Sequence, residues 1–181
     1  RMSDLGYTSE AQSNIRTCYN RVESYVSLIY NAVTRPWPPY VEIGTHRDGE
    51  WIQLNTNMLQ IENEYYASIR PKRTARTNER PNNALINRGV QYIEVRCLDI
   101  DPFEPLGISK ETAYFLDTFL LYCASQDSPL FNNTNDCEET DRNFAKVVIE
   151  GRKPGLSLER SGQATSLKDW GLEIMDKLFP Y

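Results

Sequence analysis

Apolar positions spaced by three and four residues predict a long amphipathic helix near the start of the chain. From about Ser9 to Val33, the apolar residues fall at Ile15, Tyr19, Val22, Val26, Ile29 and Val33. This spacing places them on one face of a helix. Thr8 or Ser9 is the expected N-cap, and Pro36 with Pro38-Pro39 is expected to end the helix.

Alternation of polar and apolar residues predicts strands in the middle of the chain. Two alternating runs, at 40–44 and 51–54, surround the pair Asp48-Gly49 and predict a β-hairpin. The segment from Arg88 to Leu98 alternates again and predicts a further strand. The polar segment between them carries one short expected strand near Ser68–Arg70.

Helical patterns return in the second half of the chain. Ser109 is the expected cap of a helix through Tyr122, and a second helix runs from about Asp136 to Glu150. A third begins at Ser166, has Asp169 in capping-box spacing, and reaches about Phe179. The sum is an α+β protein, with a small antiparallel sheet flanked by helices.

Composition narrows the classes of protein that fit this pattern. The chain has 181 residues and a formal net charge of -5, which suits one domain and excludes a globally basic nucleic-acid binder. No apolar run approaches the roughly 18–20 residues that span a bilayer. The chain opens at Arg1 without an initiator Met or a secretory apolar region, so we expect a piece of a longer cytoplasmic protein.

The cysteines and the single histidine argue against a zinc site. The four cysteines show no C-x-x-C spacing, and His46 lies in the expected turn before Asp48-Gly49. Neither a P-loop motif nor a G-x-G-x-x-G motif is present, which argues against a P-loop or Rossmann nucleotide site.

The predicted strand around Glu94 carries the strongest candidate chemistry. Alternation places Tyr92, Glu94 and Arg96 on one face and Ile93, Val95 and Cys97 on the other. A carboxylate and a guanidinium two residues apart can hold a divalent cation and an anion side by side, as metal-assisted phosphoryl chemistry requires. The alternative is a solvated strand face with a weak ion pair. The pattern leaves both open.

A basic stretch precedes this strand. Residues 70–80 hold five basic residues and one acidic residue, a local charge of +4 that leaves -9 on the rest of the chain. A phosphate site is one interpretation, because arginine forks match phosphate oxygens. A solvated loop is another. Nucleic acid is a third, although the stretch lacks interleaved aromatic residues for base stacking.

An acidic and aromatic run lies just before the basic stretch. Gln60–Tyr66 contains two glutamates and two adjacent tyrosines. Such residues can line a pocket for a small zwitterion, with hydroxyl groups that bind its carboxylate. The alternative is that the tyrosines are half-buried packing residues, and the pattern does not separate the two.

Together, several blocks resemble the bacterial glutamate–cysteine ligase family (γ-glutamylcysteine synthetase) of the proteobacterial type. The blocks are Arg1–Tyr7, Gln53–Asn55, Gln60–Glu64, Tyr66, Ile69–Arg73, Tyr92–Arg96, Leu98–Ile100, Pro102-Phe103 and Glu150–Leu156. The Ile93–Arg96 block is also similar to the metal and phosphate strand of glutamine synthetase. The resemblance implies a single partial domain over residues 1–181, the C-terminal portion of a glutamine synthetase-like fold.

The resemblance implies an ATP-dependent ligase. Such an enzyme joins the γ-carboxylate of L-glutamate to the amine of L-cysteine through a γ-glutamyl phosphate, the first step of glutathione biosynthesis. It would need ATP and Mg2+, with Mn2+ as an alternative ion, and no nucleic acid or membrane. Two other functions stay open: a ligase for another amine acceptor, and a non-catalytic anion- or nucleic-acid-binding module that uses Arg70–Arg80.

The resemblance also implies a role for each matching residue. Glu94 would be a metal ligand, and Arg96 would be the catalytic residue that stabilises the transferring phosphoryl group. Arg1, Tyr7 and Tyr66 would contact the amino-acid substrates, and Arg70, Lys72 and Arg73 would contact the nucleotide. The family's other metal ligands lie in an N-terminal half that this chain does not contain. We therefore expect the chain alone to be inactive.

The chain departs from the family pattern at three positions near these residues. Tyr65 stands where a leucine is expected, Ser68 where a proline is expected, and Cys97 where a serine is expected. Cys97 is expected to point away from the Glu94 face, so it should leave the site undisturbed.

Overall fold

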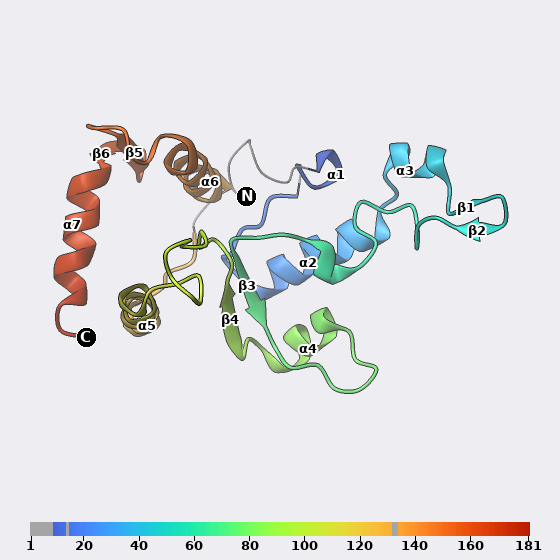
Figure 1. The fold of residues 1–181 in the computed structure, drawn as a ribbon, viewed down its shortest axis with the longest axis horizontal. Coiled ribbons are helices and arrows are strands. Elements are labelled where there is room, and N and C mark those ends of the chain that lie inside the picture. The colour runs from blue at the N-terminus through green and yellow to red at the C-terminus, as the bar shows by residue number, and fades with distance from the viewer. Residues whose placement is uncertain (1–8, 14, 132–133) are drawn as a thin grey trace. The chain divides into compact units, whose positions relative to one another are not determined.

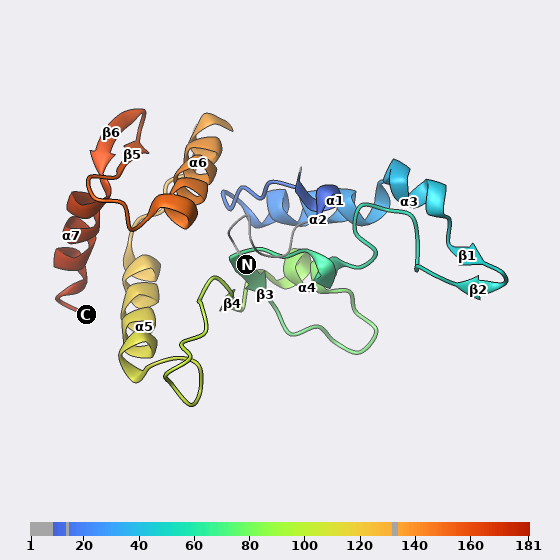
Figure 2. The same cartoon turned by 45° about the horizontal axis from the view of Figure 1, so that its top comes forward.

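The computed structural model describes residues 9–13, 15–131 and 134–181, drawn in Figures 1 and 2. Contacts divide the chain into two compact units, of which the first ends at Cys97 and the second spans Leu98–Tyr181. Helices and antiparallel strand pairs occur in both, so the α+β class is confirmed. The expectation of a single partial domain remains a prediction. In the part that the structure describes, no helix is long and apolar enough to cross a membrane.

The first unit contains four α-helices, a 3-10 helix and four strands among its described residues. The helices are α1 (Glu10–Ser13), α2 (Val22–Thr34), α3 (Pro38–Ile43), η1 (Glu62–Glu64) and α4 (Pro81–Arg88). The strands are β1 (His46–Arg47), β2 (Glu50–Trp51), β3 (Ile69–Lys72) and β4 (Tyr92–Val95). β1 pairs with β2 and β3 pairs with β4, both antiparallel.

The prediction of one helix from Ser9 to Val33 is wrong, because α1 and α2 are separate helices. Residues 15–21 between them are not helical. Tyr65 competes for this segment: its hydroxyl donates to the carbonyl oxygen of Ile15 at 3.3 Å and lies 2.9 Å from the hydroxyl of Thr17. Of the two residues expected to cap the helix, Ser9 directly precedes α1 and Thr8 lies outside the described residues.

The Asp48-Gly49 hairpin is confirmed, but its strands are shorter than expected. Both turn residues have positive φ, 52° and 84°, as a two-residue hairpin turn requires. The preceding alternating run forms α3 instead of a strand. Pro38 opens α3 at its first turn, where a missing N–H costs nothing, and Gly44 ends it with φ 76°.

The two strands expected near the candidate site are present with shifted bounds. β3 extends the expected strand at Ser68–Arg70, and β4 is shorter than the predicted Arg88–Leu98. At the N-terminal end, α4 takes Arg88 and its C-cap takes Gly89, so the strand begins only at Tyr92. Pro81 begins α4 and Gly89, with φ 72°, ends it by donating to the carbonyl oxygen of Leu85 at 2.8 Å.

The core of the first unit forms where α2 packs against η1 and α4. Its buried residues are Ile15, Tyr25, Ile29, Ala32, Leu59, Tyr65, Ala67 and Leu85. Ile29 and Leu59 are almost fully buried, and the Leu59 N–H donates to the carbonyl oxygen of Ala32 at 3.0 Å. This core fixes the segment 59–67, from which the chain runs directly into β3.

The described part of the second unit contains three α-helices and one hairpin. The helices are α5 (Lys110–Ser125), α6 (Thr134–Glu150) and α7 (Leu167–Leu178), and the strands are β5 (Ser157–Arg160) and β6 (Gln163–Ser166). All three helices are confirmed. Two predicted caps are present, since Ser109 Oγ accepts from Thr112 N at 3.1 Å and Ser166 Oγ accepts from Asp169 N at 3.3 Å.

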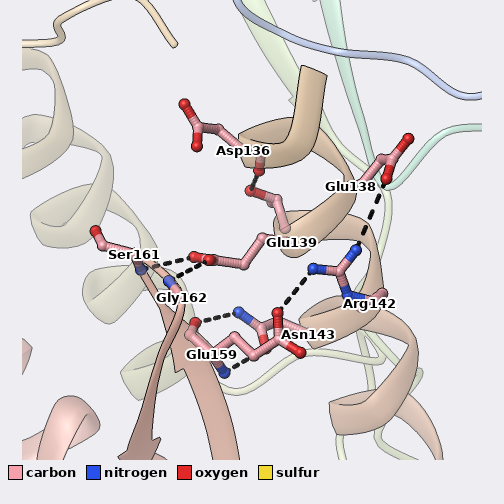
Figure 3. A network of polar contacts seen from close by, with 9 residues as sticks. Asp136, Glu138, Glu139, Arg142, Asn143, Glu159, Ser161 and Gly162 are labelled. Carbon is pink, nitrogen blue, oxygen red and sulfur yellow. Dashed lines mark hydrogen bonds and ion pairs between the residues drawn. The ribbon is translucent and has the colours of Figure 1, made fainter. Parts of the chain in front are cut away.

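The β5–β6 hairpin was not predicted, and contacts from α6 hold it in place (Figure 3). Its turn residues Ser161 and Gly162 have φ 53° and 74°. The Glu139 carboxylate accepts both turn N–H groups, at 3.0 and 2.8 Å. The Asn143 amide pairs with the backbone N–H and C=O of Glu159 at 2.9 and 2.6 Å. Asn143 thus covers an edge of β5 that would otherwise be unpaired.

The raised pKa of Tyr25 makes the stability of the first unit sensitive to high pH. Burial is the main cause of the rise in this pKa, from 10.0 to about 12. Between pH 10 and 12 the unfolded chain has released the Tyr25 proton while the folded chain retains it, so the free energy of unfolding should fall by about 3 kcal/mol. Tyr25→Phe should remove this part of the pH slope in urea unfolding. Tyr30→Phe, an exposed control on the same helix, should not, and equal slopes for both variants would contradict the assignment.

Removal of the Glu139 carboxylate should loosen the β5–β6 turn. Glu139→Ala leaves two turn N–H groups without their acceptor, which should cost about 1 kcal/mol locally and speed amide exchange at Ser161 and Gly162 roughly fivefold. The control is Glu138→Ala, whose exposed pair with Arg142 at 3.9 Å should contribute little. Unchanged amide exchange at Ser161 and Gly162 in Glu139→Ala would show that the turn is stable without this carboxylate.

Candidate functional site

The β3–β4 hairpin brings the basic stretch against the predicted catalytic strand. Its register places Arg70 opposite Glu94 and Lys72 opposite Tyr92. Residues directly opposite in an antiparallel pair share a face. The hairpin therefore adds basic side chains from β3 to the face that alternation predicts for Glu94.

The Glu94 carboxylate lies between two cations. Its Oε1 is 3.2 Å from Nε of Arg96, and its Oε2 is 3.8 Å from Nζ of Lys72. All three side chains are about one third exposed, at 29–34%, so water screens these pairs only in part. The predicted pairing of Glu94 with Arg96 is present, and Lys72 joins it across the hairpin.

Tyr66 also contacts Arg96, through both its ring and its hydroxyl. The guanidinium carbon of Arg96 lies 5.3 Å from the centre of the Tyr66 ring, within cation–π range. The Tyr66 hydroxyl donates to the backbone oxygen of Arg96 at 2.9 Å. Backbone and side chain of Arg96 are thus held by one residue. We name Tyr66, Lys72, Glu94 and Arg96 the hairpin cluster.

Two of the three residues expected at the nucleotide donate hydrogen bonds to backbone carbonyl oxygens of the protein. Arg70 is only 7% exposed, and its Nη2 donates to the carbonyl oxygen of Asn63 at 3.1 Å. Nη1 of Arg73 donates to the carbonyl oxygens of Arg88 and Gly89, at 2.5 and 3.2 Å, and so caps the end of α4. The basic stretch therefore does not present these arginines on one exposed surface. Only Lys72 of the three joins the hairpin cluster.

The remaining predicted residues have different outcomes. Arg1 and Tyr7 lie outside the described residues. His46 is exposed, and its ring contacts that of Trp51 in a tilted arrangement, with 3.8 Å between the ring centres. Among the residues that the structure describes, no three His, Cys, Asp or Glu side chains gather as a metal site would require. Since Mg2+ in proteins is bound through carboxylates and retained water, Glu94 alone does not make a complete magnesium site.

Sequence reasoning missed one charged residue that organises this region. Glu62 Oε2 accepts from the backbone N–H of Asn82 at 2.9 Å, and so satisfies the first free donor of α4. Twenty residues separate the two partners along the chain, and no local pattern marks the contact.

The family of the chain follows from comparison with known proteins. Residues 1–147 match the family model described as glutamate-cysteine ligase. The chain belongs to the glutamate–cysteine ligase family.

Relatives within this family match the whole chain. The glutamate–cysteine ligase of Bordetella parapertussis is 61% identical over 181 residues, which are 100% of this chain and 34% of that protein. The glutamate–cysteine ligase of Pseudomonas fluorescens is 58% identical over 99% of this chain and 34% of its own length. This chain thus spans about one third of the curated glutamate–cysteine ligases that it matches.

A solved glutamate–cysteine ligase shares the fold. The structure from Francisella tularensis, a complex with AMP, matches with a TM-score of 0.88 and 44% identity over 98% of this chain and 36% of that chain. The match agrees with the expectation of part of a glutamine synthetase-like fold, with helices and small antiparallel sheets.

The hydroxyl of Tyr66 should contribute measurably to stability through Arg96. Tyr66→Phe keeps the ring beneath the guanidinium and removes the hydrogen bond to the Arg96 carbonyl, so the free energy of unfolding should fall by about 1 kcal/mol. Urea unfolding of the chain measures this change. Tyr92→Phe is the matched control, since this exposed tyrosine lies on the same hairpin. An equal, negligible effect of both variants would show that the Tyr66 hydroxyl does not hold Arg96.

Proposed function

We propose that this chain supplies part of the active site of an ATP-dependent ligase that joins L-glutamate to L-cysteine. Membership of the family and the AMP complex of the Francisella tularensis relative support this proposal. The observation that carries it is the placement of Arg96, which is held by Glu94 and Tyr66 directly after β4, in the block to which the resemblance assigns the phosphoryl chemistry.

The arrangement suits Arg96 to phosphoryl chemistry. Glu94 takes the Nε side of the guanidinium and Tyr66 covers one face, which leaves the two Nη groups as donors. A guanidinium held in this way can bind two phosphoryl oxygens at once. In the proposed reaction, the glutamate γ-carboxylate attacks the γ-phosphorus of ATP and ADP leaves. The cysteine amine then attacks the acyl phosphate and inorganic phosphate leaves.

The other predicted roles follow in the same proposal. Glu94 gives one carboxylate to a magnesium site whose other ligands come from outside the described residues, and Arg1, Tyr7 and Tyr66 contact the amino acids. Lys72 faces the nucleotide, while Arg70 and Arg73 act by holding β3 and α4. The protein works in the cytoplasm. Because one carboxylate is too few for the metal, the chain alone should make no product.

A chimera tests this proposal. The chain would replace the corresponding third of the Bordetella parapertussis ligase, to which it is 61% identical. The chimera should form γ-glutamylcysteine from ATP, glutamate and cysteine, and this chain alone should not. No activity in a folded chimera, or activity of the isolated chain, would contradict the proposal. Ammonia and a diamine in place of cysteine distinguish other acceptors.

Variants within the chimera test the residue roles. Arg96→Lys keeps the charge but loses the two-pronged geometry, so kcat should fall at least about 100-fold. Glu94→Gln should raise the Mg2+ concentration needed for half-maximal activity, a change that loss of an ion pair alone would not cause. Arg76→Gln, in the same basic stretch and exposed, is the control and should leave kcat unchanged. Full activity of Arg96→Lys would refute its role.

A further inference from the structure

A hollow of about 620 Å3 lies between α2 and the N-terminal end of α4, away from the hairpin cluster. Its polar lining comes from three elements of the first unit: Ser27, Tyr30 and Asn31 on α2, Glu62 on η1, and Arg80, Asn82 and Asn83 at the start of α4. The volume falls within the range typical of small-molecule sites. No residue of the hairpin cluster lines it.

Asn82 is the unusual residue in the wall of this hollow. It is only 5% exposed, and its Nδ2 has no hydrogen-bond partner among the residues that the structure describes. The main-chain N–H of the same residue is satisfied by Glu62, so only the side-chain amide lacks a partner. A buried donor left unpaired costs about 1–3 kcal/mol, and native proteins rarely tolerate one without a use. An acceptor group on a ligand in the hollow would supply the missing partner.

The charges around the hollow define the chemistry of that ligand. Among the described residues that line it, Glu62 and Arg80 are the only charged ones. Arg80 is exposed at the N-cap position of α4 and makes no ion pair with a described residue. Glu62 uses one carboxylate oxygen for Asn82, which leaves the other for a cation. A guanidinium and a carboxylate in one wall suit a ligand that carries both an anionic and a cationic group.

A second hollow of about 530 Å3 adjoins the first, because the same two charged residues line it. It continues along α2 past Val33 and Thr34. The first hollow also has an apolar portion, formed by Val26 and Ile86. The charged pair thus has apolar surface beside it that a ligand side chain can cover.

We propose that this hollow binds a free α-amino acid with an aliphatic side chain. Arg80 and the Asn82 amide hold its carboxylate, and the α4 N-terminus adds a favourable dipole. Glu62 holds the ammonium group of the amino acid, and the aliphatic side chain of the amino acid lies on Val26 and Ile86. This site is separate from the ligase chemistry, and the inference does not depend on the proposed function.

Three probes that share one isobutyl group test the recognition of both charged groups. The 15N-labelled chain is titrated with L-leucine, with 4-methylpentanoate, which lacks the ammonium group, and with 3-methylbutylamine, which lacks the carboxylate. L-leucine should give saturable shifts centred on the Asn82 side chain and the Asn83 N–H, and each analogue should bind at least about tenfold more weakly. No saturable shift with L-leucine, equal binding of all three probes, or shifts centred elsewhere would overturn the proposal.

Variants assign the two charges separately. Arg80→Gln should weaken L-leucine binding at least about tenfold and leave binding of the amine unchanged. Glu62→Gln keeps an oxygen for the Asn82 N–H and should lower the affinity for L-leucine to that for 4-methylpentanoate. The matched control Arg76→Gln removes an arginine outside the hollow and should bind as the wild type does. A loss in Arg76→Gln equal to that in Arg80→Gln would overturn the site, and a dispersed spectrum confirms that each variant is folded.

Discussion

The candidate site depends on the hydrogen bond that the buried guanidinium of Arg70 donates to the backbone of the core segment. Burial of a charge is unfavourable unless hydrogen bonds replace its water, and Arg70, at 7% exposure, donates to the carbonyl oxygen of Asn63. This bond joins β3 to the segment that the core of the first unit holds rigid. Because Arg70 lies opposite Glu94 in the hairpin, the position of β4 is set by the core.

The basic stretch shows how one cluster of charge can have several roles. Its local charge of +4 suggests a single anion-binding surface, but neighbouring residues diverge in the structure. Arg70 is buried against the carbonyl oxygen of Asn63 and Arg73 caps α4, while Lys72 lies beside Glu94. Arg70 and Lys72 share a face of β3, but Arg70 is buried and Lys72 is partly exposed, and Arg73 follows the end of the strand. The positive charge is therefore divided among separate contacts and does not form a single ligand surface.

Features set by neighbours in the sequence could be predicted. The Ser109 and Ser166 caps and the Asp48-Gly49 turn depend on residues within three positions, and all three are present. The break between α1 and α2 depends on Tyr65, some 50 residues away. The β5–β6 hairpin likewise depends on Glu139. These long-range contacts override local propensity, and no local pattern reports them.

The contacts of the candidate site likewise divide into those that the local sequence predicts and those that depend on the fold. The pairing of Glu94 with Arg96 follows from period two on one strand, so the sequence was sufficient to predict it. The approach of Lys72 depends on the hairpin register, and the place of Tyr66 beneath Arg96 depends on the fold of the whole unit. The family resemblance predicts Tyr66 as a substrate contact, and in the structure Tyr66 also contacts Arg96 through its ring and its hydroxyl.

The 3-10 helix η1 links the hairpin cluster and the hollow through adjacent residues. The Asn63 carbonyl accepts from Arg70 beneath the hairpin, and the Glu62 carboxylate accepts from Asn82 at the start of α4. η1 is only three residues long, and its hydrogen-bond geometry is poorer than that of an α-helix, so its own backbone does little to fix it. Its position is instead determined by these two contacts and by the core residues Leu59 and Tyr65 on either side. A displacement of Glu62 therefore acts directly on its neighbour Asn63, whose carbonyl oxygen accepts the hydrogen bond from Arg70 that positions β3.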